Sequence, residues 1–153
     1  MNSKKITHLY IAKQKFELIA RQKITQHIDK SKFQAFITDH PDYFVWYENT
    51  EAGEKVLSNI DKFISKERML AELNKSSAHS CYNPKKKCYS FQTSFIDHYG
   101  TISINPIAPG YMSFEFLEIL LQLANHCEAM LLLNGKRQIT REFIESEKSK
   151  IEK

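Results

Sequence analysis

The chain has 153 residues, of which 42% are hydrophobic and 26% are charged. This composition is typical of a globular protein, and the length allows one domain with its own core without disulfides or metals. No run approaches about 18 apolar residues and the basic N-terminus continues into polar sequence, so we expect no membrane span, no secretory leader and a cytoplasmic location.

The charge is unevenly distributed although the net charge is only +4. Residues 1–36 carry eight basic side chains against two acidic ones, whereas residues 37–61 carry six acidic side chains against Lys55 alone. Nucleic-acid-binding proteins usually have a stronger and more continuous basic excess. The pattern therefore favours other kinds of partner.

The first third of the chain predicts a strand and a short helix. Residues 6–11 are β-prone, while residues 16–20 fit a strand and a helix equally well, because the run is too short to show a period. Asp29 or Ser31 is a suitable N-cap for a short helix with apolar side chains on one side. We expect that helix to end before Pro41, since the residue before proline is disfavoured in the α region.

The middle of the chain is less regular. Residues 43–47 are rich in aromatic and β-branched side chains, and we expect them to form a central strand. Thr50 could cap a following segment, and the apolar spacing from Val56 to Leu73 fits one broken helix or two short helices. Residues 75–87 are polar and include three consecutive lysines, so we expect an exposed loop there.

The region from residue 89 onward has the clearest pattern. Residues 89–95 alternate apolar and polar side chains, and Ile102 and Ile104 repeat the alternation after a turn at Gly100, which predicts an antiparallel hairpin. Ser113 is a good N-cap for a helix to about Glu128 with a wide apolar stripe. Two short strands at residues 130–133 and 137–140 and a polar helix from residue 141 follow.

Together these elements predict one α+β domain over residues 1–153. We expect a mostly antiparallel sheet of about four to five strands, with helices packed on one face. Residues 1–5 and 146–153 are expected to fray.

Candidates for catalysis or metal binding are weak. His79, Cys81, Cys88, His126 and Cys127 are of zinc-ligand type, but they lack a CxxC pair, and an odd number of cysteines at low density suits free thiols in a reduced compartment. The pairs Asp97-His98 and Asp39-His40 could provide acid–base chemistry, but neighbouring residues in a strand point to opposite faces. We therefore assign no catalytic residue, no metal and no cofactor.

A basic run offers one possible interface. Lys85, Lys86 and Lys87 combine positive charge with Tyr82 and Tyr89, on whose rings bases could stack. With the N-terminal lysines, this run supports an alternative function as a small nucleic-acid-associated module.

An acidic and aromatic block offers the other interface. Aromatic side chains supply binding energy, while the flanking acids steer a basic partner. The partner-binding residues that we predict are Asp39, Asp42, Tyr43, Glu48, Glu51 and Glu54.

With this block at residues 39–51, no catalytic motif and a compact α+β pattern, the chain resembles the immunity proteins that accompany bacterial contact-dependent toxins. The resemblance implies a cytoplasmic inhibitor that neutralises one cognate toxin by covering its active site, without turnover or cofactor. The net positive charge departs from the acidic character common among nuclease inhibitors. A nuclease as the target is therefore not implied.

Overall fold

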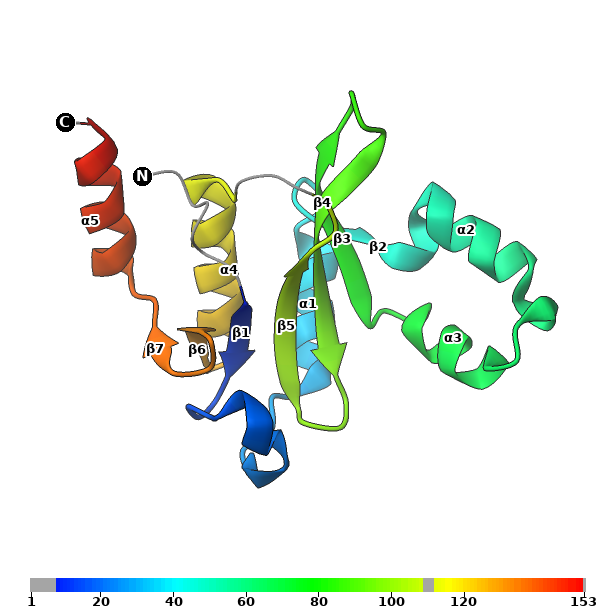
Figure 1. Cartoon of the computed structure of the whole chain (residues 1–153), viewed down its shortest axis with the longest axis horizontal. Helices are drawn as coiled ribbons and strands as arrows, with labels where there is room; N and C mark the ends of the chain where they lie inside the picture. Colours follow the sequence, from blue (N-terminus) through cyan, green and yellow to red (C-terminus); the bar gives the residue numbers. More distant parts are fainter. Residues whose placement is uncertain (1–7, 109–111, 153) are drawn as a thin grey trace.

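A single antiparallel sheet organises the protein. The computed structural model describes residues 8–108 and 112–152. The strands lie in the order β2-β3-β4-β5-β1-β6-β7, and each strand is antiparallel to its neighbours (Figure 1). Their bounds are β1 (Leu9–Ala12), β2 (Val45–Trp46), β3 (Ser77–Asn83), β4 (Cys88–Ile96), β5 (Thr101–Pro106), β6 (Met130–Leu133) and β7 (Arg137–Gln138).

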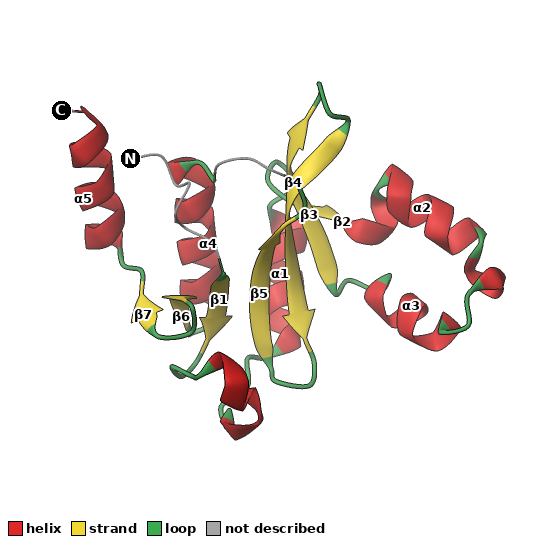
Figure 2. Cartoon of the chain, viewed as in Figure 1, coloured by secondary structure: helices red, strands yellow, loops and turns green. Residues whose placement is uncertain are grey.

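Over residues 8–108 and 112–152, five α-helices and three short 3-10 helices accompany the sheet. Figure 2 shows how the helices and strands are arranged. The α-helices are α1 (Lys30–Asp39), α2 (Glu51–Ser58), α3 (Lys66–Glu72), α4 (Phe114–His126) and α5 (Arg141–Glu152). The 3-10 helices are η2 (Leu18–Lys23), η3 (Tyr47–Asn49) and η4 (Ile60–Lys62). In the described residues, none of these helices has the length and apolarity needed to cross a membrane.

The predicted helix N-caps are confirmed. The side chains of Asp29, Thr50 and Ser113 each accept a hydrogen bond from a backbone N–H in the first turn of α1, α2 and α4. Each cap satisfies a backbone donor that the helix itself leaves unpaired. The local sequence therefore determines where these three helices begin.

The main hydrophobic core lies between the sheet and the helices α1, α4 and α5. Phe33 of α1, Leu120 of α4 and Ile144 of α5 belong to one buried cluster with Leu9 and Ile11 of β1. Because successive strand residues point to opposite faces, Tyr10 and Ala12 instead join a smaller cluster with Phe16, Ile24 and Leu132. The segment around η2 thus covers part of the sheet's second face.

The predicted α+β class and antiparallel sheet are confirmed, but the sheet has seven strands rather than four to five. One reason is β3, which occupies part of the expected loop at residues 75–87. Its buried side chains, those of Ser77, Ala78 and Ser80, are small and show no apolar alternation that sequence reading would detect. The predicted strand at residues 43–47 shortens to β2 and lies at the edge of the sheet, not at its centre.

Between β2 and β3 the chain leaves the sheet. Residues 51–74, which we call the arm, comprise α2, η4 and α3 and stand to the right of the sheet in Figure 1. Of the two alternatives left open by the sequence, two short helices is correct. Gly53 and Leu73 are the arm's buried residues.

Candidate protein-binding surface

Exposed apolar side chains gather on the arm and beside it. The described residues expose eight large apolar or aromatic side chains, of which four lie on the arm: Leu57, Phe63, Ile64 and Leu70. Two more, Tyr82 and Ile107, line a cleft where the arm begins. Single exposed apolar residues are ordinary, whereas a concentration of them marks an interaction site.

The start of the arm is held rigidly. The Thr50 hydroxyl donates to the Tyr47 carbonyl oxygen at 2.6 Å and accepts from the Gly53 N–H at 3.0 Å. A Cβ at Gly53 would lie 1.8 Å from the Tyr47 carbonyl oxygen, so only glycine allows the first turn of α2 to pack this closely. The orientation of α2 relative to the sheet is therefore fixed by backbone contact.

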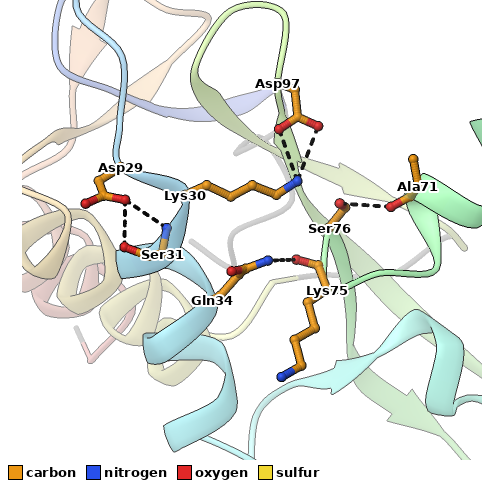
Figure 3. Close-up of polar contacts among 8 residues, drawn as sticks. All are labelled: Asp29, Lys30, Ser31, Gln34, Ala71, Lys75, Ser76 and Asp97. Atoms are coloured by element: carbon orange, nitrogen blue, oxygen red, sulfur yellow. Dashed lines mark hydrogen bonds and ion pairs between the residues drawn. The ribbon is translucent and has the colours of Figure 1, made fainter.

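The two ends of the arm are joined at its base. The Lys75 N–H donates to Glu48 Oε2 at 2.7 Å, which links the end of the arm to the segment just before it. Figure 3 shows the other side of this junction, where Gln34 of α1 donates to the Lys75 carbonyl oxygen at 3.2 Å. Lys75 has a left-handed backbone, with φ of 52°. Its N–H and carbonyl group both have partners, so this turn is well supported.

Figure 3 shows two further contacts, of which the first holds the end of the arm and the second is a largely exposed ion pair outside it. The Ser76 hydroxyl donates to the carbonyl oxygen of Ala71, in α3, at 3.1 Å. Lys30 Nζ lies 3.1 Å from Asp97 Oδ1 and joins the first turn of α1 to the turn between β4 and β5. The arm therefore projects from a firmly held base.

A cleft of about 420 Å³ lies between the start of α2 and the β3–β4 hairpin. Thr50, Glu51 and Ala52 form the α2 side, while the hairpin contributes aromatic side chains and Lys87. The volume falls in the range of small-molecule binding pockets. The cleft thus adjoins the exposed apolar residues of the arm.

The aromatic wall of this cleft is a connected row of rings. The centroids of Tyr82 and Tyr89 are 5.0 Å apart, those of Tyr89 and His79 are 5.7 Å apart, and both pairs are edge-to-face. Behind His79, the Tyr47 ring lies at 5.0 Å. Burial lowers the pKa of His79, which favours its neutral imidazole. The rings of the wall therefore lie at steep angles to one another, and the His79 ring is held in its neutral form.

The structure separates the six predicted partner-binding residues into three places. Asp39, Asp42 and Tyr43 lie where α1 ends, and the Tyr43 hydroxyl donates to Glu115 Oε1 of α4 at 2.7 Å. Through this hydrogen bond Glu115 raises the pKa of Tyr43. The negative charge of Asp42 also raises the pKa of Tyr43. Glu115 therefore lies in the same acidic group as Asp42 and Tyr43, a proximity that the sequence did not indicate.

The other three predicted residues belong to the arm or its base. Glu48 is half-buried and supports the base through Lys75, as described above. Glu51 and Glu54 are exposed on the first turn of α2, and Glu51 lies 3.5 Å from Lys55 in a solvent-exposed ion pair. Such pairs contribute little stability, so the Glu51 carboxylate is accessible to a partner.

The candidate catalytic histidines are engaged locally. Asp97 is paired with Lys30, and the His98 ring packs edge-to-face on Tyr99 at 4.8 Å. His40 stacks on Phe36 with a centroid distance of 3.9 Å, and its Nδ1 lies 2.7 Å from the Phe36 carbonyl oxygen. In the part of the chain that the structure describes, no hydrogen bond joins either histidine to its neighbouring aspartate.

The three cysteines lie in different environments. Cys127 is buried, Cys88 is half-buried and Cys81 is exposed. All three are free thiols. Burial of the sulfur, with a contribution from Glu115, raises the pKa of Cys81 to about 11, so the thiol stays protonated near neutral pH. Among the described residues, no three His, Cys, Asp or Glu side chains are placed to hold a metal ion.

The predicted basic run occupies the turn between β3 and β4. Lys85, Lys86 and Lys87 are exposed, and the Asn83 side chain accepts hydrogen bonds from the N–H groups of Lys85 and Lys86. Lys87 has a left-handed backbone, with φ of 54°, and lines the cleft. Lys87 of the basic run and Glu51 at the start of α2 therefore line the same cleft, although they are distant in the sequence.

Sequence reading missed two contributors to this surface. The apolar spacing of the arm predicted helices, but it gave no sign that Leu57, Phe63, Ile64 and Leu70 would be exposed. Ile107 lies just after β5 and carries no motif, so no signal in the sequence linked it to Tyr82 and Glu51.

Comparisons with known proteins found no relative from which a role for this surface could be transferred. No protein-family model, no curated protein and no solved structure matches the chain.

Proposed function

We propose that the protein is a non-enzymatic protein-binding inhibitor that acts in the cytoplasm and neutralises a cognate bacterial toxin by covering its active site. One observation carries the protein-binding part: six of the eight large exposed apolar or aromatic side chains of the described residues lie on the arm or in the adjoining cleft. The toxin as target is supported by the resemblance of the sequence to immunity proteins. The arm and the cleft together are the proposed contact surface.

The anatomy of this surface suits a specific complex. Protein interfaces combine an apolar or aromatic centre with a charged and hydrated rim. Here Ile64 is fully exposed in the linker between η4 and α3, and the acidic Glu51 and Glu54 stand on α2 of the same arm. The rigid base reduces the ordering cost that binding would otherwise carry.

The test compares capture of a partner by matched variants. The affinity-tagged protein is used on nuclease-treated lysate of its own cells, together with the double variant Leu57→Asp, Ile64→Asp and the control Ile19→Asp. Ile19 is 94% exposed but lies on η2, away from the arm. We expect one stoichiometric protein partner with the native chain and the control, and its loss with the arm variant.

A second step tests inhibition with purified components. The captured partner should lose its toxic activity when the native protein is added in equimolar amount, and should keep it when the arm variant is added. Equal capture by all three proteins would overturn the assignment of the arm. A complex that forms without any loss of partner activity would overturn the inhibitor function.

The acidic residues of α2 make a kinetic prediction. The double variant Glu51→Lys, Glu54→Lys should slow association with a basic partner, and the effect should grow as the salt concentration falls, because exposed charges act through long-range steering. Unchanged association rates at low salt would remove these two acids from the interface.

The alternative function is a small nucleic-acid-associated module. Its specific support is the exposed run Lys85–Lys87 beside the rings of Tyr82 and Tyr89. This alternative predicts salt-dependent retention on single-stranded DNA or RNA that weakens when the three lysines are changed to glutamine. No retention at about 50 mM salt would exclude it, because electrostatic binding is strong at that salt concentration.

A further inference from the structure

We infer that the cleft between α2 and the β3–β4 hairpin is a receptor for an arginine side chain of the partner protein. The partner as the source of this arginine rests on the proposed function. The cleft's preference for a guanidinium group rests on its own walls.

The first argument is the aromatic wall. A cation is attracted to the electron-rich face of an aromatic ring, and rings set edge-to-face present faces in more than one direction. Tyr82, Tyr89 and His79 have this arrangement, with successive centroid distances of 5.0 Å and 5.7 Å. Tyr82 lines the cleft and is 53% exposed, so its side chain is accessible to a ligand.

The second argument is the charge on the opposite wall. Glu51 lies on the α2 side of the cleft, and the carboxylate is exposed. A guanidinium group that stacks on the tyrosine rings would also be attracted to this carboxylate, with which it can form two parallel hydrogen bonds. An ammonium group lacks the planar shape needed for stacking, so arginine is favoured over lysine.

Lys87 is the opposing charge in the cleft. It belongs to the same hairpin as the two tyrosines and is exposed. An ammonium group on a flexible four-carbon stem can move out of a cleft at little cost. We therefore expect Lys87 to compete weakly with the incoming arginine, and its neutralisation to strengthen binding. An anionic occupant would require the opposite effect.

The third argument is rigidity. Gly53 and Thr50 hold the start of α2 on the Tyr47 backbone, and the Tyr47 ring in turn packs against His79. Both walls are thus fixed to the same short segment. A preformed cleft needs less ordering on binding, and arginine and tyrosine are frequent among residues that dominate binding energy.

The test uses a small probe in place of the partner. The isotope-labelled full chain is titrated with N-acetyl-arginine methylamide and, as a matched neutral control, N-acetyl-citrulline methylamide, and binding is followed by NMR shifts. We expect saturable shifts for His79, Tyr82 and Tyr89 with the arginine probe, and affinity about two- to fivefold weaker for citrulline, in line with an exposed cation–π contact.

Three variants assign the effect to individual side chains. Glu51→Gln and Tyr82→Leu should each weaken binding of the arginine probe by about two- to fivefold. Lys87→Gln should strengthen it. Equal affinity for citrulline, weaker binding by Lys87→Gln, or the absence of any saturable shift would overturn the inference.

The outcomes separate this inference from the proposed function. If the arginine probe binds as expected but no protein partner is captured, the inhibitor function fails and the receptor remains. If a partner is captured through the arm but Glu51→Gln and Tyr82→Leu leave the probe and the complex unaffected, the receptor fails and the inhibitor function remains.

Discussion

Replacing Gly53 by alanine should destabilise the protein, although the same change in an exposed helix normally stabilises it. Alanine is favoured over glycine inside a helix by about 1 kcal/mol. At this position the new Cβ would lie 1.8 Å from the Tyr47 carbonyl oxygen. Since a carbon normally stays about 3.3 Å or more from a carbonyl oxygen, α2 must move by roughly 1.5 Å.

That movement has two costs. Overpacking against backbone atoms, which cannot rotate away, costs about 1–3 kcal/mol. The hydrogen bond between the Thr50 hydroxyl and the Gly53 N–H, now 3.0 Å long, would also break, and losing such a cap costs about 1 kcal/mol. When the gain of about 1 kcal/mol in helix propensity is subtracted from these two costs, we expect the free energy of unfolding to fall by about 2 kcal/mol.

Urea unfolding followed by fluorescence of Trp46 measures this loss. Trp46 is the single tryptophan, is buried and immediately precedes Tyr47. Hydrogen exchange of the α2 amides would detect a loss confined to the arm. Ala52→Gly is the matched control, because Ala52 is exposed and should follow helix propensity alone, with a loss of at most about 1 kcal/mol. A Gly53→Ala variant as stable as the native chain, or more so, would refute the reasoning.

Three further predictions concern the core, a thiol and a helix cap. Phe33→Ala should lower the free energy of unfolding, measured in urea, by about 3–5 kcal/mol. The Phe33 ring is fully buried and joins α1 to two strands, since it lies 5.9 Å from the Trp46 ring and 5.8 Å from the Phe95 ring. A loss near zero would contradict this role. Alkylation of Cys81 in the folded chain, followed by mass spectrometry, should be slower near neutral pH than that of free cysteine. Its rate should rise as the pH approaches the Cys81 pKa of about 11, and fast labelling near neutral pH would contradict this raised pKa. Asp29→Ala should lower the melting temperature at neutral pH but not in acid. Hydrogen bonds from Ser31 lower the pKa of Asp29, so this stabilisation is present above the pKa of the unfolded state and is lost as pH falls through the lower folded value. An equal loss at both pH values would show that the Asp29 charge is not involved.

The parts of the fold that sequence reading predicted are those where local and long-range signals agree. The helix with its N-cap at Ser113 has a wide apolar stripe, and α4 was found where expected. The alternation at residues 89–95 and 102–104 likewise gave β4 and β5. In both cases the periodicity of burial matches the period of the backbone structure.

The parts that it missed depend on contacts between distant segments. Ser77, Ala78 and Ser80 are buried because neighbouring strands and the core cover them, and small side chains carry no periodic signal. The apolar residues of the arm carry a strong signal, but their exposure depends on where the arm stands relative to the sheet. The cleft brings Glu51 close to Tyr82 and Lys87, and no spacing in the sequence reports that proximity.

The two margins of the sheet restrict how other chains can attach. β2 and β7 form the margins, and each is two residues long. β3 is longer than β2 and continues beyond the residues that pair with it. In this unpaired part Cys81 has a left-handed backbone, with φ of 61°, which interrupts the regular row of backbone N–H and carbonyl groups. Short and interrupted margins oppose the addition of a foreign strand, and so protect a sheet against edge-to-edge aggregation. A ligand peptide should therefore be recognised by its side chains, without becoming an eighth strand.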